Sequence, residues 1–439
     1  MRAAAVSSRA RLVAATSGVC IAWLAPGLVQ AESLADAWQQ ALVADANLAS
    51  IHSEKEAAEA DYRGASRQRL PVLDVTGSYT QLRDSPYFDV QTPSGPFVSP
   101  KIFRNDVYAS GGVNLSVPLW TSGRLTGSIG AAEAGARAAY ALEIRSTSDL
   151  KLAVAEAYVA VLRARQALDI ATSSVASLQA HVDDVQVMYD KEAVAQSDLL
   201  AAKVALANAA QQKLRAANGE RLALAVYNRW LGQPMSRQAE LEPPAAAPIE
   251  SGVTLEQMTA RALERRPELA AASARQQSLE QQARAERAQG LPQIALNAGY
   301  NHYDNQILDR QNFVSVGVGL QWRLFDSGQL QARTSALRGR ARAARLQLAD
   351  LRSGVALQVE TALLNRDEAE ARIKAVSEAV AQAEENARIS RELYGSGLGT
   401  NTQVLDAETL LLTARNNRSD ATYDLLIAGY RLLRAMGEL

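Results

Sequence analysis

The sequence FVSVGVGLQWRLFDSGQL at residues 313–330 joins a strand-like segment to a long helix-like segment. Apolar residues occupy every second position of this stretch: Val314, Val316, Val318, Leu320, Trp322 and Leu324. Small or polar residues lie between them, and this period of two predicts a strand over 313–323 with one apolar and one polar face. No proline follows, and the region is rich in alanine, leucine, glutamine, arginine and glutamate. This composition predicts a long helical hairpin over 325–437.

The same arrangement occurs earlier in the chain. PLWTSGRL (118–125) aligns with RLFDSGQL (323–330) at an offset of 205 residues, and SLADAWQQAL (33–42) aligns with TLEQMTARAL (254–263) at an offset of 221. We therefore predict a first structural repeat at 32–230, an irregular equatorial connector at 231–253 and a second repeat at 254–439. Each repeat is expected to hold a helix, two strands and a long helical hairpin. The remaining strands are expected at about 72–82, 107–117 and 293–302, and the first hairpin at 120–230.

The predicted strands are about nine to eleven residues long, which suits a tilted strand that crosses a bilayer. Aromatic residues lie near their ends, as in the girdles of membrane barrels: Tyr79, Trp120, Tyr300, Tyr303, Phe313, Trp322 and Phe325. A half-buried sheet of a soluble protein would show the same alternation, so that alternative stays open on the pattern alone. Four strands cannot close a membrane barrel, and lipid does not tolerate open edges. A membrane location therefore requires several chains to share one barrel.

The connections between the strands differ in length. The segment 82–107 contains four prolines and is predicted to be a long loop, whereas HYDNQILDRQN (302–312) is short and polar. Long loops on one side of the strands are typical of the outer end of an outer-membrane barrel.

An apolar heptad repeat runs through 154–185 of the first predicted hairpin. Its two seam positions hold Val154, Val161, Leu168, Val175 and Val182, and Ala157, Ala164, Ala171, Leu178 and Val185. Such a seam is typical of coiled-coil packing, and a helix of about 60 residues spans roughly 90 Å. A soluble coiled-coil spacer is the alternative. That alternative does not explain why each hairpin follows directly from a pair of strands.

The composition excludes several function classes. The 439 residues carry a formal net charge of −1, which gives no sign of a nucleic-acid partner. The three histidines are scattered, and no Ser-His-Asp arrangement, HExxH or CxxC occurs, so we expect no enzyme, no metal site and no cofactor. The basic start, the apolar stretch and VQA at 29–31 predict a cleaved signal peptide at 1–31. Cys20 lies inside it, and the sequence leaves open whether that cysteine is lipidated.

With these features together, the chain resembles the TolC family of outer-membrane efflux and secretion channels. The resemblance covers about 33–439 and rests on the duplication, on LPVLDVTGSY and LPQIALNAGY, on LWTSG and LFDSG, and on LYGSGLGTNTQVLDAE. It implies an α+β membrane protein that forms a homotrimer, with a twelve-stranded β-barrel in the outer membrane continued by an α-helical barrel in the periplasm. The implied function is a passive duct of a tripartite efflux or type I secretion system. The implied partners are a periplasmic adaptor (membrane fusion) protein and, through it, an inner-membrane RND or ABC pump.

The resemblance also assigns roles at two helical tips, 189–203 and 394–408. It implies adaptor contacts at Glu192, Ala193, Val194, Gly397, Leu398, Gly399 and Thr400, and a periplasmic gate at Tyr394, Ser197, Asp198, Gln403 and Asp406. Gly399 stands where the family example has an arginine, and Gln403 where it has an aspartate. The alternative is that Asp198 and Asp406 are solvated helix charges, that Asp198 is a helix N-cap, and that Tyr394 only packs.

The three alternate glycines in YGSGLG (394–399) raise the possibility of a phosphate-binding loop. Helix is predicted on both sides of them, whereas such a loop needs a preceding strand. We therefore interpret them as a tight reversal between antiparallel helices, in which glycine accepts a positive φ.

A periplasmic coiled-coil scaffold or adhesin without a pore remains the alternative function. The cargo, whether drug, metal or protein, is not indicated by the sequence.

Overall fold

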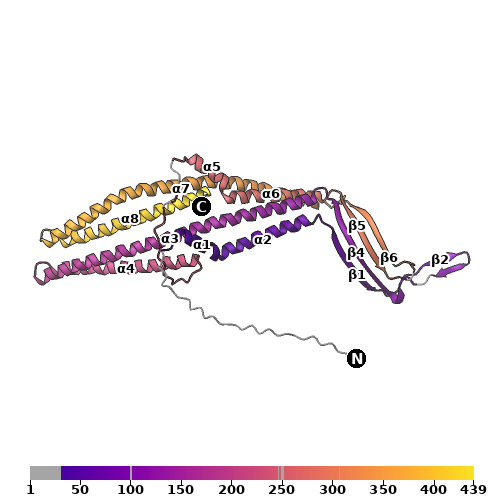
Figure 1. The fold of residues 1–439 in the computed structure, drawn as a ribbon, viewed down its shortest axis with the longest axis horizontal. Coiled ribbons are helices and arrows are strands. Elements are labelled where there is room, and N and C mark those ends of the chain that lie inside the picture. The colour runs from indigo at the N-terminus through magenta and orange to yellow at the C-terminus, as the bar shows by residue number, and fades with distance from the viewer. Residues whose placement is uncertain (1–30, 99–100, 246, 249–251, 306) are drawn as a thin grey trace, which may run out of the picture.

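The computed structural model describes residues 31–439 except 99–100, 246, 249–251 and 306. The signal peptide predicted at 1–31 therefore lies, apart from its last residue, outside the described residues, as does Cys20. The molecule is elongated, with a curved sheet at one end and two helical hairpins that reach to the other end (Figure 1).

The helices are α1 (Leu34–Ala44), α2 (Ala46–Arg67), α3 (Arg124–Asp190), α4 (Gln196–Trp230), α5 (Leu255–Arg265), α6 (Pro267–Ala288), α7 (Gln329–Gly395) and α8 (Asn401–Met436). The strands are β1 (Val72–Gln81), β2 (Asp89–Thr92), β3 (Gly95–Val98), β4 (Val107–Trp120), β5 (Gln293–Tyr303) and β6 (Asn312–Gln321). A single 3₁₀ turn, η1 (Arg104–Asp106), precedes β4.

Four strands form one antiparallel sheet in the order β1–β4–β5–β6. In the single chain β1 and β6 are therefore the two edges of the sheet, each with one side unpaired. The segment 82–107, predicted as a loop, contains the short hairpin β2–β3, which projects beyond the sheet (Figure 1). Its prolines obscured these strands in the sequence. Pro96 lies in a two-stranded hairpin, where every strand is an edge and a missing N–H is tolerated.

The register places apolar and polar side chains on opposite faces of the sheet. One row across all four strands joins Val75, Val113, Tyr300 and Val314. The adjacent row joins Asp74, Asn114, Gly299 and Ser315. Among the described residues nothing covers the apolar face, and Val75 and Val314 are 79% and 74% exposed. An apolar face of this extent is unfavourable in water and marks a surface that contacts lipid or another chain.

The register also corrects the predicted aromatic girdle. Tyr303 and Phe313 lie on the polar face, where their rings stack with centroids 5.4 Å apart, so they are not part of a lipid-facing belt. Trp120 would share that polar face by strict alternation. A register shift between Pro118 and Trp120 pairs Trp120 with Ile294 and rotates it to the apolar face. β4 thus extends to Trp120, beyond the strand end predicted at 117.

The two long hairpins have matching dimensions. α3 and α7 are each 67 residues long, which corresponds to about 100 Å of helix. Most seam positions predicted by the heptad are buried, among them Val154, Val161 and Val185, each at 0% exposure. Next to the sheet the helices contact one another in the order α2, α3, α6 and α7, which matches the order of the strands. Farther away, α3 packs against α4 and α8, and α8 packs against α7.

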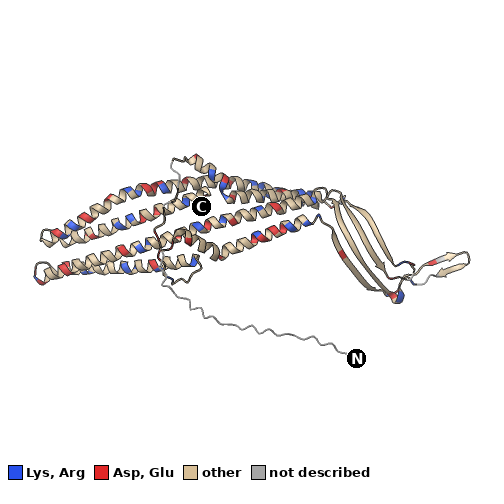
Figure 2. Ribbon diagram, in the orientation of Figure 1, with Lys and Arg blue, Asp and Glu red and all other residues tan. Residues whose placement is uncertain are grey.

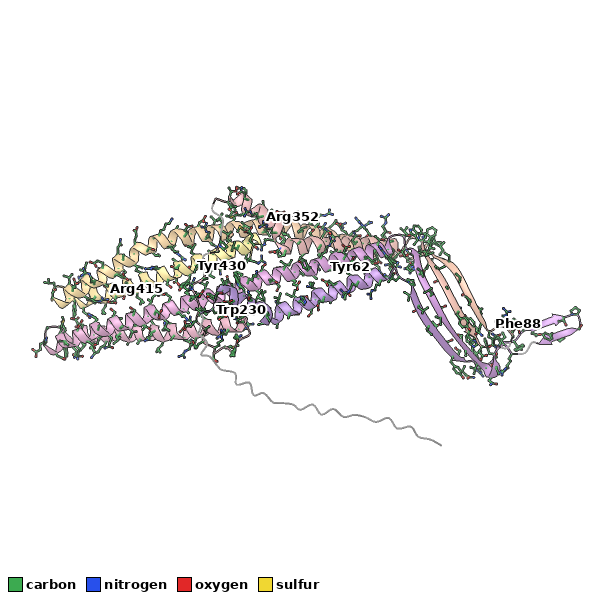
Figure 3. All side chains as sticks on the ribbon, viewed as in Figure 1. Tyr62, Phe88, Trp230, Arg352, Arg415 and Tyr430 are labelled. Atoms are coloured by element: carbon green, nitrogen blue, oxygen red, sulfur yellow. The ribbon has the colours of Figure 1, made fainter. Side chains whose placement is uncertain are left out.

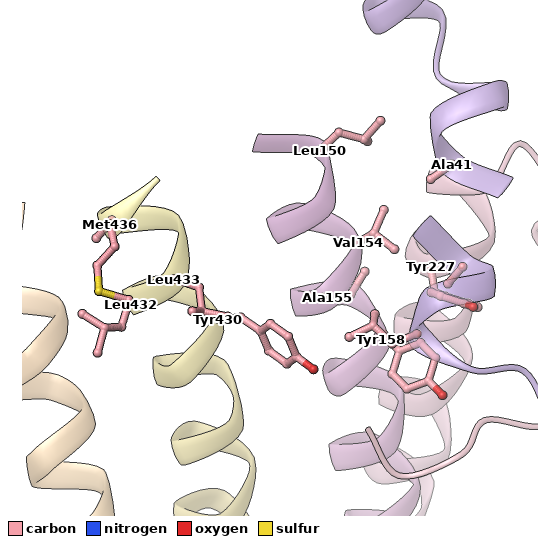
Figure 4. Close-up of a cluster of buried hydrophobic side chains, with 14 of the residues drawn as sticks. Ala41, Leu150, Val154, Ala155, Tyr158, Tyr227, Tyr430, Leu432, Leu433 and Met436 are labelled. Atoms are coloured by element: carbon pink, nitrogen blue, oxygen red, sulfur yellow. The ribbon is translucent and has the colours of Figure 1, made fainter. Parts of the chain in front are cut away.

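The largest apolar core lies in the middle of the helical part, where α1 and α5 pack beside the long hairpins. Tyr158 and Tyr227 are fully buried there with their rings edge to face (Figure 4). The Tyr158 hydroxyl lies 2.6 Å from the backbone oxygens of both Glu32 and Glu242. It thereby ties the start of the chain to the connector between the repeats. Burial raises the pKa of Tyr158 to about 12, so the phenol stays protonated and can donate.

Charged residues are abundant on the helices and nearly absent from the sheet (Figure 2). Asp74 is the only Asp, Glu, Lys or Arg in β1, β4, β5 and β6. On the helices, the Asp424 carboxylate of α8 is held by Arg163 of α3 and Arg372 of α7, so one carboxylate joins three helices. Of the helices in the described part of the chain, none combines the length and the apolar character that a membrane span requires.

Candidate functional site

The candidate site consists of the two helical tips at the end of the molecule opposite the sheet (Figure 1). The first tip, 191–195, connects α3 to α4, and the second tip, 396–400, connects α7 to α8. All the residues predicted to contact an adaptor or to form a gate lie in these turns or in the helical turns beside them.

Both tips end their long helix with the same backbone motif. The N–H of Ala193 donates to the Met188 carbonyl at 2.9 Å, and the N–H of Leu398 donates to the Leu393 carbonyl at 2.9 Å. In each tip a second bond spans three residues, from the Glu192 N–H to the Tyr189 carbonyl and from the Gly397 N–H to the Tyr394 carbonyl. The two bonds together form a Schellman cap, which requires a left-handed residue just after the helix. Gly397 fills that position with φ of 76° and Glu192 fills it with φ of 60°. The first tip therefore holds a side chain in a conformation that favours glycine.

The three glycines of the second tip have different roles, which corrects the interpretation that all three accept a positive φ. Only Gly397 does so. A Cβ at Gly395 would meet no atom within 4 Å. A Cβ at Gly399 would lie 3.0 Å from the Tyr394 amide nitrogen and 3.1 Å from the Leu393 Cβ. Gly399 thus lies in close approach to the end of α7. A side chain there would force its neighbours to move by a few tenths of an ångström.

The next helix begins differently in the two tips. Thr400 and Gln403 form a capping box at the start of α8. The Gln403 backbone N–H donates to the Thr400 hydroxyl at 3.3 Å, and the Gln403 side-chain Oε1 accepts from the Thr400 backbone N–H at 2.9 Å. Gln403, predicted as a gate residue, therefore uses its side chain to cap its own helix. In α4 the N-cap is Ala195, which offers no side-chain acceptor. Asp198 lies in the first turn and is not the N-cap considered above.

Tyr394 lies in the apolar contact between the tips. It is 6% exposed and packs among Val182, Val185, Leu199, Ala202 and Val404, which come from α3, α4 and α8. Its hydroxyl is buried without a hydrogen-bond partner among the described residues, so a Tyr394–Asp198 hydrogen bond is not formed within the single chain. Burial, and then the charge of Asp198, raises the pKa of Tyr394. The predicted gate contact stays a prediction for the assembled protein.

His181 belongs to this site, although in the sequence it is only one of three scattered histidines. Its Nε2 lies 2.7 Å from Asn401 Oδ1, and its ring contacts the Tyr394 ring edge to face at 5.3 Å. Asn401 in turn donates through Nδ2 to the Asp198 backbone oxygen at 3.0 Å. Since the Asn401 amide nitrogen is the donor in that bond, its oxygen accepts and His181 Nε2 donates. The histidine and the asparagine are each 4% exposed, and together they join the first hairpin to the second.

A second polar junction between the hairpins lies farther from the tips. Arg391 Nε donates to Glu408 Oε1 at 2.7 Å, and Ser177 of α3 donates to the same oxygen at 3.0 Å. About two helical turns farther from the tips, Arg415 on α8 pairs with Glu384 of α7 at 2.9 Å (Figure 3). These groups line a cavity of about 540 Å³ between the hairpins. Glu408 is 5% exposed and is compensated by its two donors.

The other predicted tip residues are accessible. Glu192, Ala193, Ser197, Gly397 and Thr400 are exposed, Val194 and Gly399 are half-buried, and Leu398 is 80% exposed. Asp406 is exposed on α8 and Asp198 is half-buried on α4, and neither side chain makes an ion pair within the part of the chain that the structure describes. Across the same described residues no group of three His, Cys, Asp or Glu side chains is placed to hold a metal ion.

The long hairpins, the four-stranded sheet and the paired tips agree with the comparison to known proteins. The chain matches the family model described as "Outer membrane efflux protein" over residues 37–226 and 259–438. The chain belongs to this family. The two matched ranges fall within the two predicted repeats, and this member of the family is an outer-membrane protein of the efflux class, as the resemblance to the TolC family predicted.

Individual relatives agree with this assignment. The chain is 24% identical to the outer membrane protein TolC of Vibrio cholerae over 418 residues, which cover 94% of this chain and 92% of the relative. It is 25% identical to the alkaline protease secretion protein AprF of Pseudomonas aeruginosa over 298 residues, 65% of this chain and 61% of the relative. The solved structure of the outer membrane protein VceC of Vibrio cholerae superposes with a TM-score of 0.79 at 20% identity, over 92% of this chain and 96% of that one. The structural likeness confirms the predicted fold class.

Proposed function

We propose that three copies of this chain form one passive duct of a tripartite efflux or type I secretion system. The observation that carries the proposal is the sheet, with its unpaired edges at β1 and β6 and its uncovered apolar face. Unpaired backbone groups and apolar side chains are both satisfied if β6 of one copy pairs with β1 of the next, so that twelve strands close in lipid. The polar row that includes Asn114 and Ser315 then lines the interior.

The helices extend the duct away from the membrane. Because the strand order is repeated by α2, α3, α6 and α7, closing the sheet also brings α7 of one copy beside α2 of the next. α3 and α7 run for about 100 Å, enough to carry an interior channel far into the periplasm. The proposed domain organisation is therefore two repeats, 32–230 and 254–439, that each contribute half of the strands and helices of one subunit.

The tips are proposed to dock on a periplasmic adaptor protein that connects the duct to an inner-membrane RND or ABC pump. Support comes from Leu398, a large apolar side chain that is 80% exposed at the extreme end of the molecule. The corresponding place of the first tip holds Ala193, and the half-buried Val194 follows it. Exposed apolar anchors at the end of a rigid hairpin are suited to a helical partner. The AprF relative extends the proposal to secretion as well as efflux, and the protein itself is proposed to have no enzymatic activity.

The entrance is proposed to be held closed by the contacts between the two hairpins at the tips. Tyr394, Ser197, Asp198, Gln403 and Asp406 remain the proposed gate residues, of which Gln403 acts by capping α8. His181 and Asn401 are added because they join the hairpins directly.

Cysteine crosslinking tests the proposed assembly. Ser78 of β1 and Ser315 of β6 lie on the polar face, and cysteine pairs scanned around these two positions should join one copy to the next. A closed ring of three yields covalent dimers and trimers and nothing larger, together with heat-modifiable trimers on a gel and conductance in planar bilayers. Longer ladders, or a monomer without conductance, would contradict the proposal. An adaptor that copurifies would identify the class of pump.

A further inference from the structure

An arginine-rich groove lies between α6 and α7, beside the sheet. It is lined by Arg284 and Arg287 of α6 and by Arg338, Arg342 and Arg345 of α7, with Glu280 as its acidic residue, and it encloses about 380 Å³. The buried Ala283 and Ala341 form its floor, because their small side chains let the two helices approach closely. We refer to this feature as the arginine groove.

The charge of the arginine groove is largely unbalanced within the chain. Arg345 pairs with Glu280 at 3.2 Å, and Gln276 donates to the same carboxylate. The hydrogen bond from Gln276 and the charge of Arg345 lower the pKa of Glu280, so it stays ionised and offsets one arginine. The other four arginines of the groove make no ion pair with any residue that the structure describes. Arginines this close repel one another unless an anion lies between them.

The groove opens on the side of the apolar face of the sheet. Gln289, at the end of α6, lines a cavity on the polar face with Ser116, Asn297 and Gln321. Successive residues of a helix are rotated by about 100°, so Arg287 and Arg284 lie about 160° and 140° around α6 from Gln289. They therefore project from the opposite side of the helix, the side that the proposed assembly presents to its surroundings and not to the duct.

The groove also lies at the level where the lipid surface is expected. Trp322 and Phe325 are 55% and 84% exposed next to the sheet, and Trp322 donates to the Gly290 backbone oxygen at 3.1 Å. Exposed aromatic residues of this kind mark the membrane–water interface. Gly290 follows Arg287 by three residues, and the stretch from Arg287 to Glu280 is about 10 Å of helix. That length is comparable to the headgroup layer, which is roughly 5–8 Å thick on each side of a bilayer.

We propose that the arginine groove binds the phosphate-bearing headgroup of an anionic phospholipid in the periplasmic leaflet of the outer membrane. The proposal rests on the proposed function, because it needs the sheet to lie in the membrane with its apolar face outward. Guanidinium groups recognise phosphate oxygens through paired N–H donors, and the adjoining apolar face accommodates the acyl chains. A free anion would bind to the guanidinium groups but would make no use of the apolar face.

Lipid binding to the purified trimer tests this proposal. Native mass spectrometry or fluorescence titration in detergent measures binding of short-chain phosphatidylglycerol, phosphatidylcholine and inorganic phosphate. The double variant Arg284→Gln/Arg338→Gln removes two groove arginines, and Arg333→Gln/Arg340→Gln is the matched control, because Arg333 and Arg340 lie about 140° and 160° around α7 from Arg338. We expect phosphatidylglycerol affinity to fall about 10- to 30-fold in the groove variant and to stay unchanged in the control.

The outcomes separate this proposal from the proposed function. Equal phosphatidylglycerol binding by wild type and groove variant overturns it, as does phosphatidylcholine binding of equal strength. Competition by inorganic phosphate at the same concentration as the lipid shows a free-anion site only and also overturns it. Both double variants should remain trimers with wild-type conductance. A protein that forms no trimer and no channel contradicts the proposed function instead.

Discussion

Replacing His181 by leucine tests whether the contact between the hairpins holds the entrance closed. Leucine keeps much of the side-chain volume but removes the donor that lies 2.7 Å from Asn401 Oδ1. Asn401 is only 4% exposed, so its oxygen would be left buried without a partner. An unsatisfied buried polar group costs about 1–3 kcal/mol. Separating the hairpins exposes that oxygen to water and relieves the cost, so the substitution destabilises the closed arrangement specifically.

The expected size follows from this cost. About 1–3 kcal/mol corresponds to a shift of about 5- to 150-fold in the closed-to-open ratio for each subunit whose hairpins separate. The measurement is single-channel conductance in planar bilayers, together with the susceptibility of cells to a large antibiotic that enters through a leaky duct. We expect more open time and greater susceptibility for His181→Leu. His181→Gln is the control, because glutamine retains an N–H donor for Asn401.

Two results would refute the reasoning. His181→Leu with the open time of the wild type shows that the contact does not hold the entrance closed. His181→Gln as open as His181→Leu shows that the ring contact with Tyr394 matters and the hydrogen bond does not. A double-mutant cycle with Asn401→Leu supplies the coupling energy directly, and a coupling near zero also contradicts the prediction.

The remaining predictions concern the tips and the carboxylate that joins three helices. Glu192→Gly should stabilise the first tip by about 0.5–1 kcal/mol, because glycine adopts the left-handed backbone conformation of this position without strain. Ser396→Gly is the control and should bring no gain, because Ser396 has a φ of −89°. Hydrogen exchange at the tips measures both effects. Gly399→Ala should destabilise the second tip by about 1–3 kcal/mol and Gly395→Ala should not, and equal exchange rates in the two variants would disprove the close approach. Burial opposes ionisation of Asp424, but its two arginines lower its pKa below the ordinary value of 3.8. The ionised carboxylate therefore contributes fully to the free energy of unfolding above pH 3.8, and this contribution is lost as the pH falls through the lowered pKa. The difference in melting temperature between wild type and Asp424→Asn should accordingly be large at pH 7 and shrink at pH 3.

Much of the architecture was predictable because it depends on local periodicity. Alternation with period two and the heptad seam follow from the geometry of a single strand or helix, and burial of Val154 and Val185 agrees with the seam. The offset of 205 residues between the repeats also recurs, since α3 and α7 begin and end that many residues apart. The short strands β2 and β3 were missed because their prolines and glycine resemble a loop.

The site was only partly predictable, because its contacts join residues far apart in the chain. His181 and Asn401 are 220 positions apart, and only the packing of α3 against α8 brings them to hydrogen-bond distance. The signal available in the sequence was weak: a histidine two helical turns before Tyr189, adjacent to the apolar seam. The position of Gln403 suggested a gate, which stays a prediction, and the structure adds that its side chain caps α8 together with the nearby Thr400.

The sequence by itself determined that this chain has two-faced strands, long coiled-coil hairpins and two repeats, because these properties depend on residues within a few positions of each other. The tertiary structure decided which face each aromatic residue takes, since one register shift moves Trp120 to the apolar side. It also decided that Gly399 lies in close approach to the end of α7, and that arginines from α6 and α7 gather in one groove. These outcomes depend on how elements distant in sequence are placed against one another. No local pattern of residues encodes that placement.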